Sequence, residues 1–362
     1  MSFLQGLFGH YLREKPTVQD IIGQEQERQF SRQIRNNLQE SQELEELSSF
    51  LERQPYAQID KSRPDNFKEY IGQNNVKDMV INLVNASKIK KTFLPHTLFW
   101  GEAGLGKTTL SYLIAKELQA NLIITSGGQL ENKDEILNVF KQFRDNCCNI
   151  LFIDEIHAIR RRIAEMLYSA MEDYRFDYTT KNNKVVNLNL PGFTLLGATT
   201  DLTRVLVPMR QRFQNRFQLT PYTIDELCTI IKAYLNRMNY YNFDDGAIGE
   251  IALRSRNVAR YCINFTKNII DFALAQNRQT DLSLAKEYFD REGVDKEGLT
   301  RYDRQYLEFL FNSKNMRAGL NTIVKALGID RLTVEREIEP YLLRRGYIII
   351  GLGGRELKEL WE

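Results

Sequence analysis

The segment 101–108 reads GEAGLGKT and matches the pattern G-x-x-x-x-G-K-[ST] at every fixed position. Backbone N–H groups of such a glycine-rich loop can surround phosphate oxygens, and the helix that follows adds positive potential. Lys107 would reach the β- and γ-phosphates of ATP, and the hydroxyl of Thr108 would bind Mg²⁺. The sequence therefore predicts a nucleotide site made of consecutive residues: Gly101, Glu102, Ala103, Gly104, Leu105, Gly106, Lys107, Thr108 and Thr109.

Two carboxylates end a second apolar run, ILFIDE, over residues 150–155. Asp154 would lie near the metal, through its bound water, and Glu155 would orient and deprotonate the attacking water. An acidic strand end alone is a weak signal, because many strands end in acids. In a chain that also has a phosphate-binding loop it is strong, and the presence of both carboxylates favours hydrolysis over nucleotide binding alone.

Polar residues also follow the next apolar run. The segment GATT would place Thr200 between the two nucleotide-binding strands, close to the γ-phosphate or the attacking water. Beyond it, Arg210 and Arg212 could stabilise charge on a γ-phosphate. An arginine in this position would face away from its own site and serve an adjacent subunit, which implies a ring. Arg260 begins a helix in an all-helical segment and could reach back to the nucleotide.

A sheet and helices must hold these residues, and the chain from Arg63 to about Thr220 alternates short apolar runs with amphipathic stretches. This pattern predicts an α/β domain with a mostly parallel sheet, because the runs are continuously apolar. Residues 222–290 are predicted to be helical only, and residues 300–362 to form three short helices and a β-hairpin. The expected strands are Thr97–Trp100, Asn121–Thr125, Asn149–Ile153 and Phe193–Ala198.

The composition limits the class of protein. Of the 362 residues, 43% are apolar and 27% are charged, which is typical of a globular protein and excludes a disordered or collagen-like chain. Lys and Arg number 49 against 47 Asp and Glu, so the net charge of +2 does not by itself predict nucleic-acid binding. The four cysteines lack zinc-ligand spacing and are expected to be free thiols. No stretch approaches the length of a membrane span and no signal peptide is recognised, so a cytoplasmic location is expected.

Residues 1–62 differ from the rest of the chain. Residues 25–54 are rich in Gln and Glu, and apolar residues recur there at roughly helical spacing. Two interpretations stay open for this N-terminal helical leader: a solvated, partly ordered extension, or a helix that docks onto a partner or a neighbouring subunit.

Taken together, these motifs resemble the RuvB family of AAA+ ATPases, from about Arg63 to Arg355. The combination of MEDY, GATT and EPYL is more specific than the general ATPase motifs. The segments that carry the resemblance are RPDNFKEYIGQ (63–73), GLGKTTL (104–110), NLIITSG (121–127), LFIDEIHAI (151–159), LYSAMEDYRFD (167–177), LPGFTLLGATT (190–200), PMRQRF (208–213), RSRNVAR (254–260) and EPYLLRRGYI (339–348).

The resemblance implies three domains after the leader: an AAA+ P-loop domain over 63–220, an all-helical lid over 221–292 and a winged-helix, DNA-binding domain over 293–362. It implies ATP and Mg²⁺ as cofactors, and a homo-oligomer in the form of a hexameric ring. It also implies duplex or Holliday junction DNA as a partner, with branch migration in recombination and repair as the function.

Individual roles follow from the same resemblance. Tyr70 and Ile71 are similar to residues that contact the adenine base, and Thr200 is similar to the residue called sensor 1. Arg212 is similar to the arginine finger that acts on the neighbouring subunit, and Arg260 to sensor 2. In the C-terminal domain, Arg355 matches a basic residue of the wing and is expected to contact DNA.

The chain departs from the family pattern in places. The P-loop has Glu102 and Ala103 where the family has two prolines, and the wing keeps a single arginine, Arg355. The hairpin expected over 173–190 carries a polar tip, Thr179 and Lys181 to Asn183, in place of the apolar residues that bind RuvA. Binding of RuvA in the usual way is therefore not expected.

Alternative functions stay open at this point. The first is a DNA motor of the RuvB type, and the second is a derived ATPase that acts as an adaptor or switch in another complex through residues 1–62 and the altered hairpin. The second is favoured by the near-neutral C-terminal domain. A purely structural, inactive ATPase conflicts with the presence of Lys107, Asp154, Glu155 and Arg212.

Overall fold

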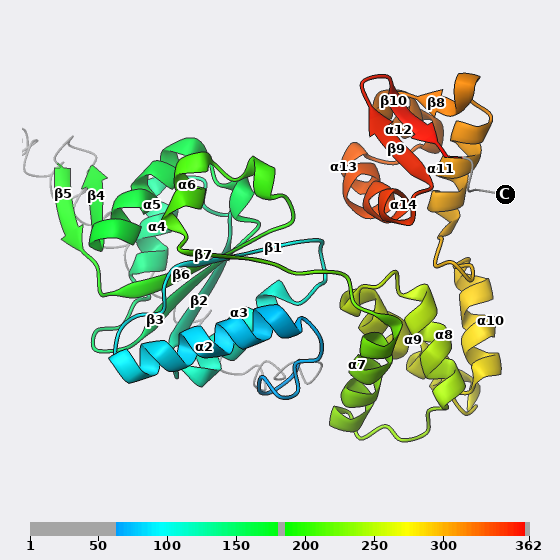
Figure 1. Ribbon diagram of the computed structural model, residues 1–362, viewed down its shortest axis with the longest axis horizontal. Helices are drawn as coiled ribbons and strands as arrows, with labels where there is room; N and C mark the ends of the chain where they lie inside the picture. The colour runs from blue at the N-terminus through cyan, green and yellow to red at the C-terminus, as the bar shows by residue number, and fades with distance from the viewer. Residues whose placement is uncertain (1–62, 180–184, 359–362) are drawn as a thin grey trace, which may run out of the picture. The chain divides into compact units, whose positions relative to one another are not determined.

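The structure is a computed structural model that describes residues 63–179 and 185–358. Its largest sheet has five strands, all paired in parallel, in the order β2-β3-β6-β1-β7 (Figure 1). Because β1, β3 and β6 are neighbours, the residues that follow their carboxyl ends meet at the same end of the sheet. The strands are β1 (Thr97–Trp100), β2 (Asn121–Ser126), β3 (Asn149–Asp154), β6 (Phe193–Thr199) and β7 (Asn215–Gln218).

The predicted α/β fold with a parallel sheet is confirmed, and the four predicted strands are present, three of them one residue longer than expected. Every residue of β6 is buried, as expected for a strand with helices on both faces. Strand β7 was not predicted. Its residues alternate between half-buried and exposed, because it lies at the edge of the sheet beside β1. A four-residue strand with two polar ends gives little signal in a sequence.

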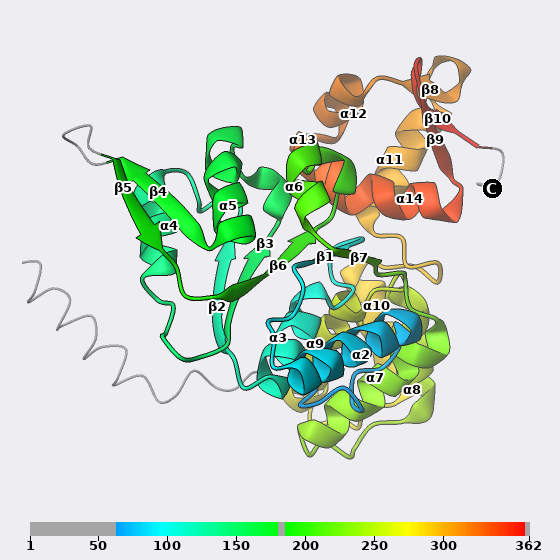
Figure 2. The same cartoon turned by 60° about the vertical axis from the view of Figure 1, so that its left-hand side comes forward.

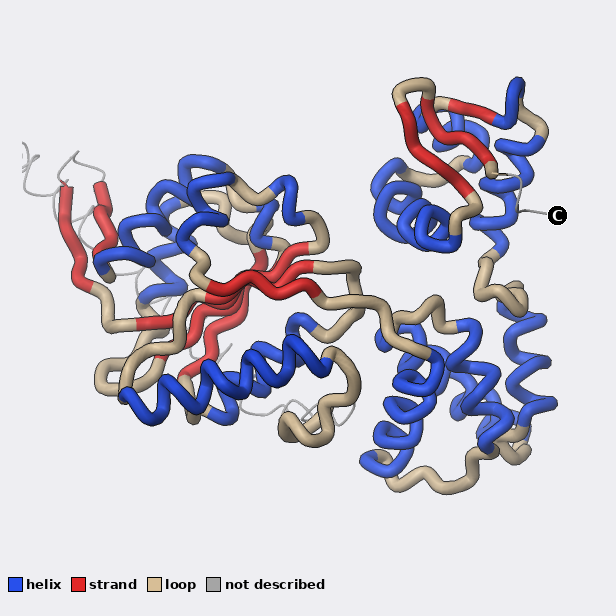
Figure 3. Tube along the Cα trace, viewed as in Figure 1, coloured by secondary structure: helices blue, strands red, loops and turns tan. Residues whose placement is uncertain are grey.

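Helices cover both faces of this sheet (Figures 1 and 3). Helices α2 (Asn74–Lys90) and α3 (Lys107–Glu117) contribute to one hydrophobic core, which also contains the apolar faces of the helices after residue 223. The second core is filled from α4 (Lys133–Phe140), α5 (Arg161–Asp173) and α6 (Val207–Arg212). The sheet is therefore a rigid layer that carries the functional side chains at its end.

A two-stranded antiparallel hairpin follows α5. It consists of β4 (Arg175–Thr179) and β5 (Val185–Asn189), paired so that Arg175 lies opposite Asn189, and it projects from the domain (Figures 1 and 2). Phe176 anchors its base, fully buried in the second core. Most of the tip that differs from the family pattern lies outside the described residues.

The region after β7 is helical, as predicted. A capping box formed by Thr223 and Glu226 starts its first helix, and the side chains of Asp244 and Asp281 cap the second and fourth. The helices are α7 (Ile224–Arg237), α8 (Asp245–Arg254), α9 (Ala259–Gln276) and α10 (Leu282–Glu292).

The C-terminal region has a separate hydrophobic core, drawn from residues 299–357, in which Tyr306, Leu310 and Leu342 are fully buried. Its three-stranded sheet has the order β8-β10-β9, where β8 is a short strand that the sequence did not predict. The predicted helices and hairpin are present, in the arrangement of a winged helix. The elements are α11 (Arg301–Phe311), β8 (Arg317–Ala318), α12 (Leu320–Leu327), the continuous helical stretch α13 (Arg331–Thr333), η4 (Val334–Ile338) and α14 (Glu339–Arg345), and the hairpin β9 (Ile348–Gly351) and β10 (Gly354–Leu357).

No helix in the described residues is long and apolar enough to cross a membrane. The leader, residues 1–62, lies outside the described residues, so both interpretations of it remain predictions.

Candidate functional site: a phosphate-binding loop at the end of the sheet

The loop between β1 and α3 has the backbone geometry of a phosphate cradle. The φ angles of Gly101, Gly104 and Gly106 are positive, at 140°, 82° and 99°. Residues other than glycine rarely adopt such angles. Gly106 is the N-cap of α3 and makes no side-chain cap, so the first N–H groups of the helix face the loop. This is the arrangement that binds anions.

Two of these glycines are also required by packing. A β-carbon on Gly101 would lie 2.5 Å from the carbonyl oxygen of Leu219, in the segment that leaves β7. A β-carbon on Gly104 would lie 2.7 Å from both Val258 Cγ1 and Arg260 Cβ. The chain after the sheet therefore lies directly against the loop.

Lys107 is buried and folds back onto its own loop. Its Nζ donates to the carbonyl oxygens of Gly101 at 2.7 Å and Glu102 at 2.8 Å. Burial lowers the pKa of Lys107, and the nearby carboxylates of Glu155 and Asp154 act in the opposite direction. The ammonium group is thus held by neutral carbonyls that phosphate oxygens can replace.

The carboxylates predicted from the sequence lie at the end of β3. Glu155 follows the strand with φ of 46° and ψ of 48°, a left-handed conformation that is uncommon for this residue and turns its side chain at the sheet end. Its Oε2 accepts a hydrogen bond from the Thr200 hydroxyl at 3.1 Å. The structure therefore brings together the two side chains that were assigned to the attacking water and to sensor 1.

His157 is a site residue that the sequence analysis did not single out. It lies in the short 3₁₀ helix η1 (Ile156–Ala158), its side chain is almost fully buried, and its Nδ1 is 3.0 Å from Oε2 of Glu155 and 2.8 Å from the Thr199 hydroxyl. Burial lowers the pKa of His157, while Glu155 acts to raise it. The only sequence signal was its position two residues after Glu155.

The metal ligands predicted from the sequence fit a site for Mg²⁺ bound together with a nucleotide. Asp154 is half-buried at the end of β3, and Thr108 is the second residue of α3. In the described residues, no group of three or more His, Cys, Asp and Glu side chains could hold a metal ion alone. Mg²⁺ bound through phosphates, waters and one or two protein oxygens needs no such group.

The residues assigned to the adenine site lie behind the loop. Tyr70 is buried, and a β-carbon on Gly106 would be 2.6 Å from its hydroxyl. This hydroxyl lies next to Gly106, as does that of Tyr222, and burial together with the neighbouring Tyr222 raises the pKa of Tyr70 well above its usual value. Ile71 is half-buried beside it in sequence. Both residues therefore lie on the segment that packs against the loop, where the adenine assignment expects them.

Arg260 and Arg212 differ in position. Arg260 is the second residue of α9, is exposed, and has its Cβ beside Gly104 of the loop, so the sensor 2 assignment stays a prediction. Arg212 ends α6, where it pairs with Glu172 at 3.1 Å and stacks 4.2 Å from the centre of the Tyr168 ring. Within the described residues, Arg212 makes its contacts on the α5–α6 side of the domain and none with the loop.

Arg355 lies in β10, but its guanidinium faces the interior of the winged helix. It makes two hydrogen bonds to the Glu339 carboxylate, at 2.8 and 3.2 Å, and Tyr306 donates a third at 2.9 Å. Only 16% of the Arg355 side chain is exposed. A contact between Arg355 and DNA, as predicted from the sequence, would require the ion pair with Glu339 to break.

Two family models match the chain: the Holliday junction DNA helicase RuvB P-loop domain over residues 62–219, and the RuvB C-terminal winged helix domain over residues 296–359. The first spans the sheet, the loop and both carboxylates. The second spans the region with the separate core.

Among curated proteins, the chain is similar to the Holliday junction branch migration complex subunit RuvB of Prochlorococcus marinus, with 38% identity over 83% of this chain and 86% of that protein. The subunit of the same name from Campylobacter hominis is 39% identical over 79% of this chain and 84% of that protein. Among solved structures, the Thermotoga maritima RuvB Holliday junction branch migration motor has a TM-score of 0.73 at 33% identity, covering 83% of this chain and 96% of that one.

Proposed function

Since the chain belongs to the RuvB family of Holliday junction branch migration ATPases, we propose that its residues hydrolyse ATP to move duplex DNA through a homo-oligomeric ring. The observation that carries this proposal is the joint placement of a phosphate-binding loop and the Glu155–Thr200 pair at one end of the sheet. A loop alone would support binding. The Glu155 carboxylate, hydrogen-bonded by Thr200 at the same end of the sheet, supports hydrolysis.

The loop binds the substrate phosphates through its N–H groups and the start of α3, and Lys107 exchanges its bonds to Gly101 and Glu102 for phosphate oxygens. Mg²⁺, when bound, would neutralise phosphate charge, held by Thr108 and Asp154. Glu155 orients a water and accepts its proton, and Thr200 fixes the position of the Glu155 carboxylate.

The transition-state charge on the γ-phosphate needs one more cation. Arg212 supplies it to a neighbouring subunit, because its described contacts lie away from the loop of its own chain. Arg260 supplies a second positive group in the same chain, beside Gly104. This division of roles requires a homo-oligomer, and a closed ring gives every site an Arg212 from its neighbour, with six subunits as the number that the family resemblance implies.

Duplex or Holliday junction DNA is the substrate of the motor, and exposed lysines of the winged-helix domain are its candidate phosphate contacts. Lys314, Lys325 and Lys358 are exposed, and no ion pair holds them in the described part of this domain. Arg317 and Arg331 are already paired with Glu356 and Glu335.

The β4–β5 hairpin is the candidate site for a RuvA-type partner. Its described exposed residues are polar, namely Arg175, Asp177, Asn187 and Asn189. A partner that binds this hairpin would be recognised through hydrogen bonds and charge more than through apolar contact.

The test is ATP hydrolysis by the purified full chain with and without a synthetic four-way junction at low salt. The proposal expects the junction to stimulate hydrolysis, and it expects binding to weaken steeply as salt rises, because phosphate contacts release counterions. Absence of both stimulation and junction binding at low salt would overturn it.

A further inference from the structure

A short turn, Ser255 to Val258, joins α8 to α9 and has an uncommon backbone. Arg256 and Asn257 are consecutive non-glycine residues with positive φ angles, of 53° and 61°. The left-handed conformation is costly for arginine and milder for asparagine, and two such residues in succession persist only when the surroundings fix them. The contacts on each side of the turn show what fixes it.

On one side the turn is bound to the phosphate-binding loop. Tyr222 donates its backbone N–H to Asn257 at 2.9 Å, and the Asn257 amide donates back to the Tyr222 carbonyl at 2.8 Å. The hydroxyl of the same tyrosine donates to the carbonyl of Leu105, in the loop, at 2.9 Å. Val258 and Arg260 complete this side by packing on Gly104. A shift of the loop on nucleotide binding therefore acts on the turn.

On the other side the turn is bound to the winged-helix domain, through Arg256. Its Nε donates to the Gly298 carbonyl at 2.9 Å, its Nη1 to the Glu337 carbonyl at 3.3 Å, and its Nη2 to the carboxylate of Asp303. Arg256 is 7% exposed and Asp303 is fully buried. A planar guanidinium is suited to such a three-way contact, which a lysine cannot reproduce.

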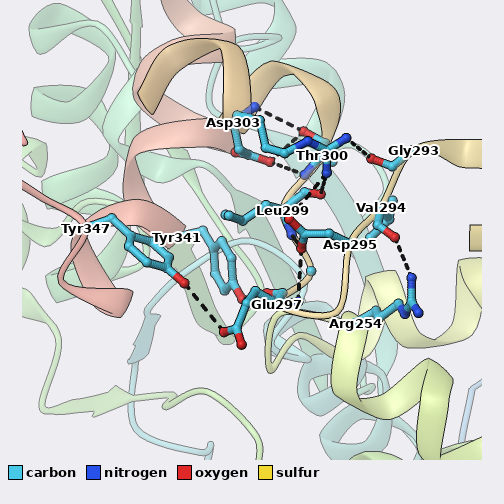
Figure 4. Close-up of polar contacts among 12 residues, drawn as sticks. Arg254, Gly293, Val294, Asp295, Glu297, Leu299, Thr300, Asp303, Tyr341 and Tyr347 are labelled. Atoms are coloured by element: carbon cyan, nitrogen blue, oxygen red, sulfur yellow. Dashed lines mark hydrogen bonds and ion pairs between the residues drawn. The ribbon is translucent and has the colours of Figure 1, made fainter. Parts of the chain in front are cut away.

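Asp303 itself is fixed within the winged-helix domain. It is part of the capping box of α11, and its Oδ2 accepts from the Thr300 N–H at 2.6 Å and the Thr300 hydroxyl at 2.5 Å (Figure 4). Arg256 therefore binds to the start of the first winged-helix helix. Removing either member of a buried pair leaves an uncompensated charge.

The connecting segment 293–300 adds to this joint. Arg254 donates to the Val294 carbonyl at 2.5 Å, and Tyr341 donates to the Glu297 carbonyl (Figure 4). Arg344 of α14 donates to the Arg256 carbonyl at 2.6 Å and pairs with Glu102 of the loop. The segment is thus hydrogen-bonded to the elements it connects and is not a free tether.

We propose that Arg256 is a positioning residue of the motor, which passes the nucleotide-dependent movement of the phosphate-binding loop to the winged-helix domain. It does so by binding the 255–258 turn, which the loop holds through Tyr222 and Gly104, to Asp303 at the start of α11. The inference rests on the proposed function. It assigns to Arg256 a part in coupling and none in the chemistry of ATP.

The experiment measures the affinity of the full chain for a fluorescent duplex without nucleotide and with a non-hydrolysable ATP analogue. The readout is the ratio of the two dissociation constants, which is a coupling between sites and which a merely structural role would not move. In Arg256→Gln and in Asp303→Asn we expect this ratio to fall toward 1, with the remainder carried by the Arg344–Glu102 pair, while DNA-free kcat and KM for ATP stay within about twofold of the wild type.

The double variant should behave like either single variant, because the two residues act as one unit. Arg345→Gln is the matched control, since it removes an exposed arginine of the same joint that pairs with Glu297, and it should keep the wild-type ratio. If Arg256→Gln does not fold, the same ratio is measured in Arg256→Lys and Asp303→Asn, and it should be lower than in the wild type.

A wild-type ratio in the folded Arg256 and Asp303 variants would overturn the inference. So would a wild-type protein whose DNA affinity does not depend on nucleotide although DNA stimulates its hydrolysis, and in that case the proposed function stands. If DNA neither binds nor stimulates the wild type, the proposed function itself fails.

Discussion

The hydroxyl of Thr200 donates to Oε2 of Glu155 over 3.1 Å, across the ends of the neighbouring strands β6 and β3. This bond holds the carboxylate in place before any substrate is present. Loss of the hydroxyl in Thr200→Val should therefore lower kcat by about 10- to 100-fold with little change in the KM for ATP. Steady-state ATP hydrolysis measures both. Thr203→Val, which removes an exposed hydroxyl of the following turn, is the control, and an unchanged kcat in Thr200→Val would remove Thr200 from the site.

Glu155→Gln should separate binding from hydrolysis. The amide keeps the shape of the side chain but cannot accept a proton from water, so hydrolysis should fall by at least about 100-fold while ATP is retained. Filter binding of labelled ATP and release of phosphate measure the two properties. Glu117→Gln, at an exposed pair with Lys88, is the matched control. Continued turnover in Glu155→Gln would mean that another group is the base.

Arg212→Ala should be inactive by itself but should be rescued by mixing. A protein with Lys107→Ala lacks a working loop but keeps Arg212, so a mixed ring contains some sites with an intact loop and a neighbouring Arg212. We expect mixtures to recover part of the wild-type ATPase activity, with a maximum near equal amounts. If no mixing ratio gives activity above that of the two variants alone, the arginine does not act between subunits.

DNA binding should depend on the exposed lysines of the winged helix more than on Arg355. Each lost phosphate contact lowers the slope of log K against log salt by about 1. Lys325→Gln should therefore weaken duplex binding and flatten its salt dependence. Arg355→Gln should mainly lower stability, since it leaves the buried Glu339 carboxylate without a cationic partner and with only the Tyr306 hydrogen bond. Fluorescence anisotropy over a salt series and thermal unfolding distinguish the two effects. A salt slope altered only by Arg355→Gln would reverse this assignment.

Acid should destabilise the fold through His96. The Leu195 N–H donates to its Nδ1 at 2.8 Å and its Nε2 lies 3.0 Å from the Met171 carbonyl, so the neutral ring satisfies both bonds. Burial lowers the pKa of His96 below the value of about 6.5 that it has when unfolded. As pH falls through that value the unfolded chain binds the extra proton first, so the free energy of unfolding decreases, by at most about 1.4 kcal/mol per pH unit.

Urea unfolding from about pH 7.5 to about pH 5.5 measures this loss. In His96→Asn the pH dependence should be smaller than in the wild type, although the variant is less stable at every pH. His157 contributes in the same direction, because burial lowers its pKa too. An equal pH dependence in the variant and the wild type would exclude His96 as the cause.

The parts of the fold that the sequence predicted are those with a local signal. Continuous apolar runs predicted β1, β2, β3 and β6, and glycine spacing predicted the loop. Strands β7 and β8 were missed, because each is short, partly polar and defined by its partner in the sheet. Their presence depends on contacts between distant residues, which periodicity does not record.

In the site, too, the residues with a local motif were predicted and those defined by distant contacts were not. The motifs predicted Lys107, Asp154, Glu155 and Thr200 as a group, and the group lies at one end of the sheet. His157 was missed, because a histidine becomes part of the site only when the chain turns at Glu155 and brings it beside Thr199. For Arg355 the residue type suggested a DNA contact, but its ion pair with Glu339 depends on how α14 packs on β10.

A substitution at Gly101 would disturb more than the binding of nucleotide to the loop. Its missing β-carbon leaves room for the Leu219 carbonyl, on the path from β7 to the helical region, as well as for phosphate. A side chain there would push apart the loop and the segment through which α7 is connected to the sheet. Loss of activity in a Gly101 variant could therefore come from a displaced connection between the sheet and α7 as readily as from a lost nucleotide contact. Gly128, whose β-carbon would meet open space, should tolerate the same change.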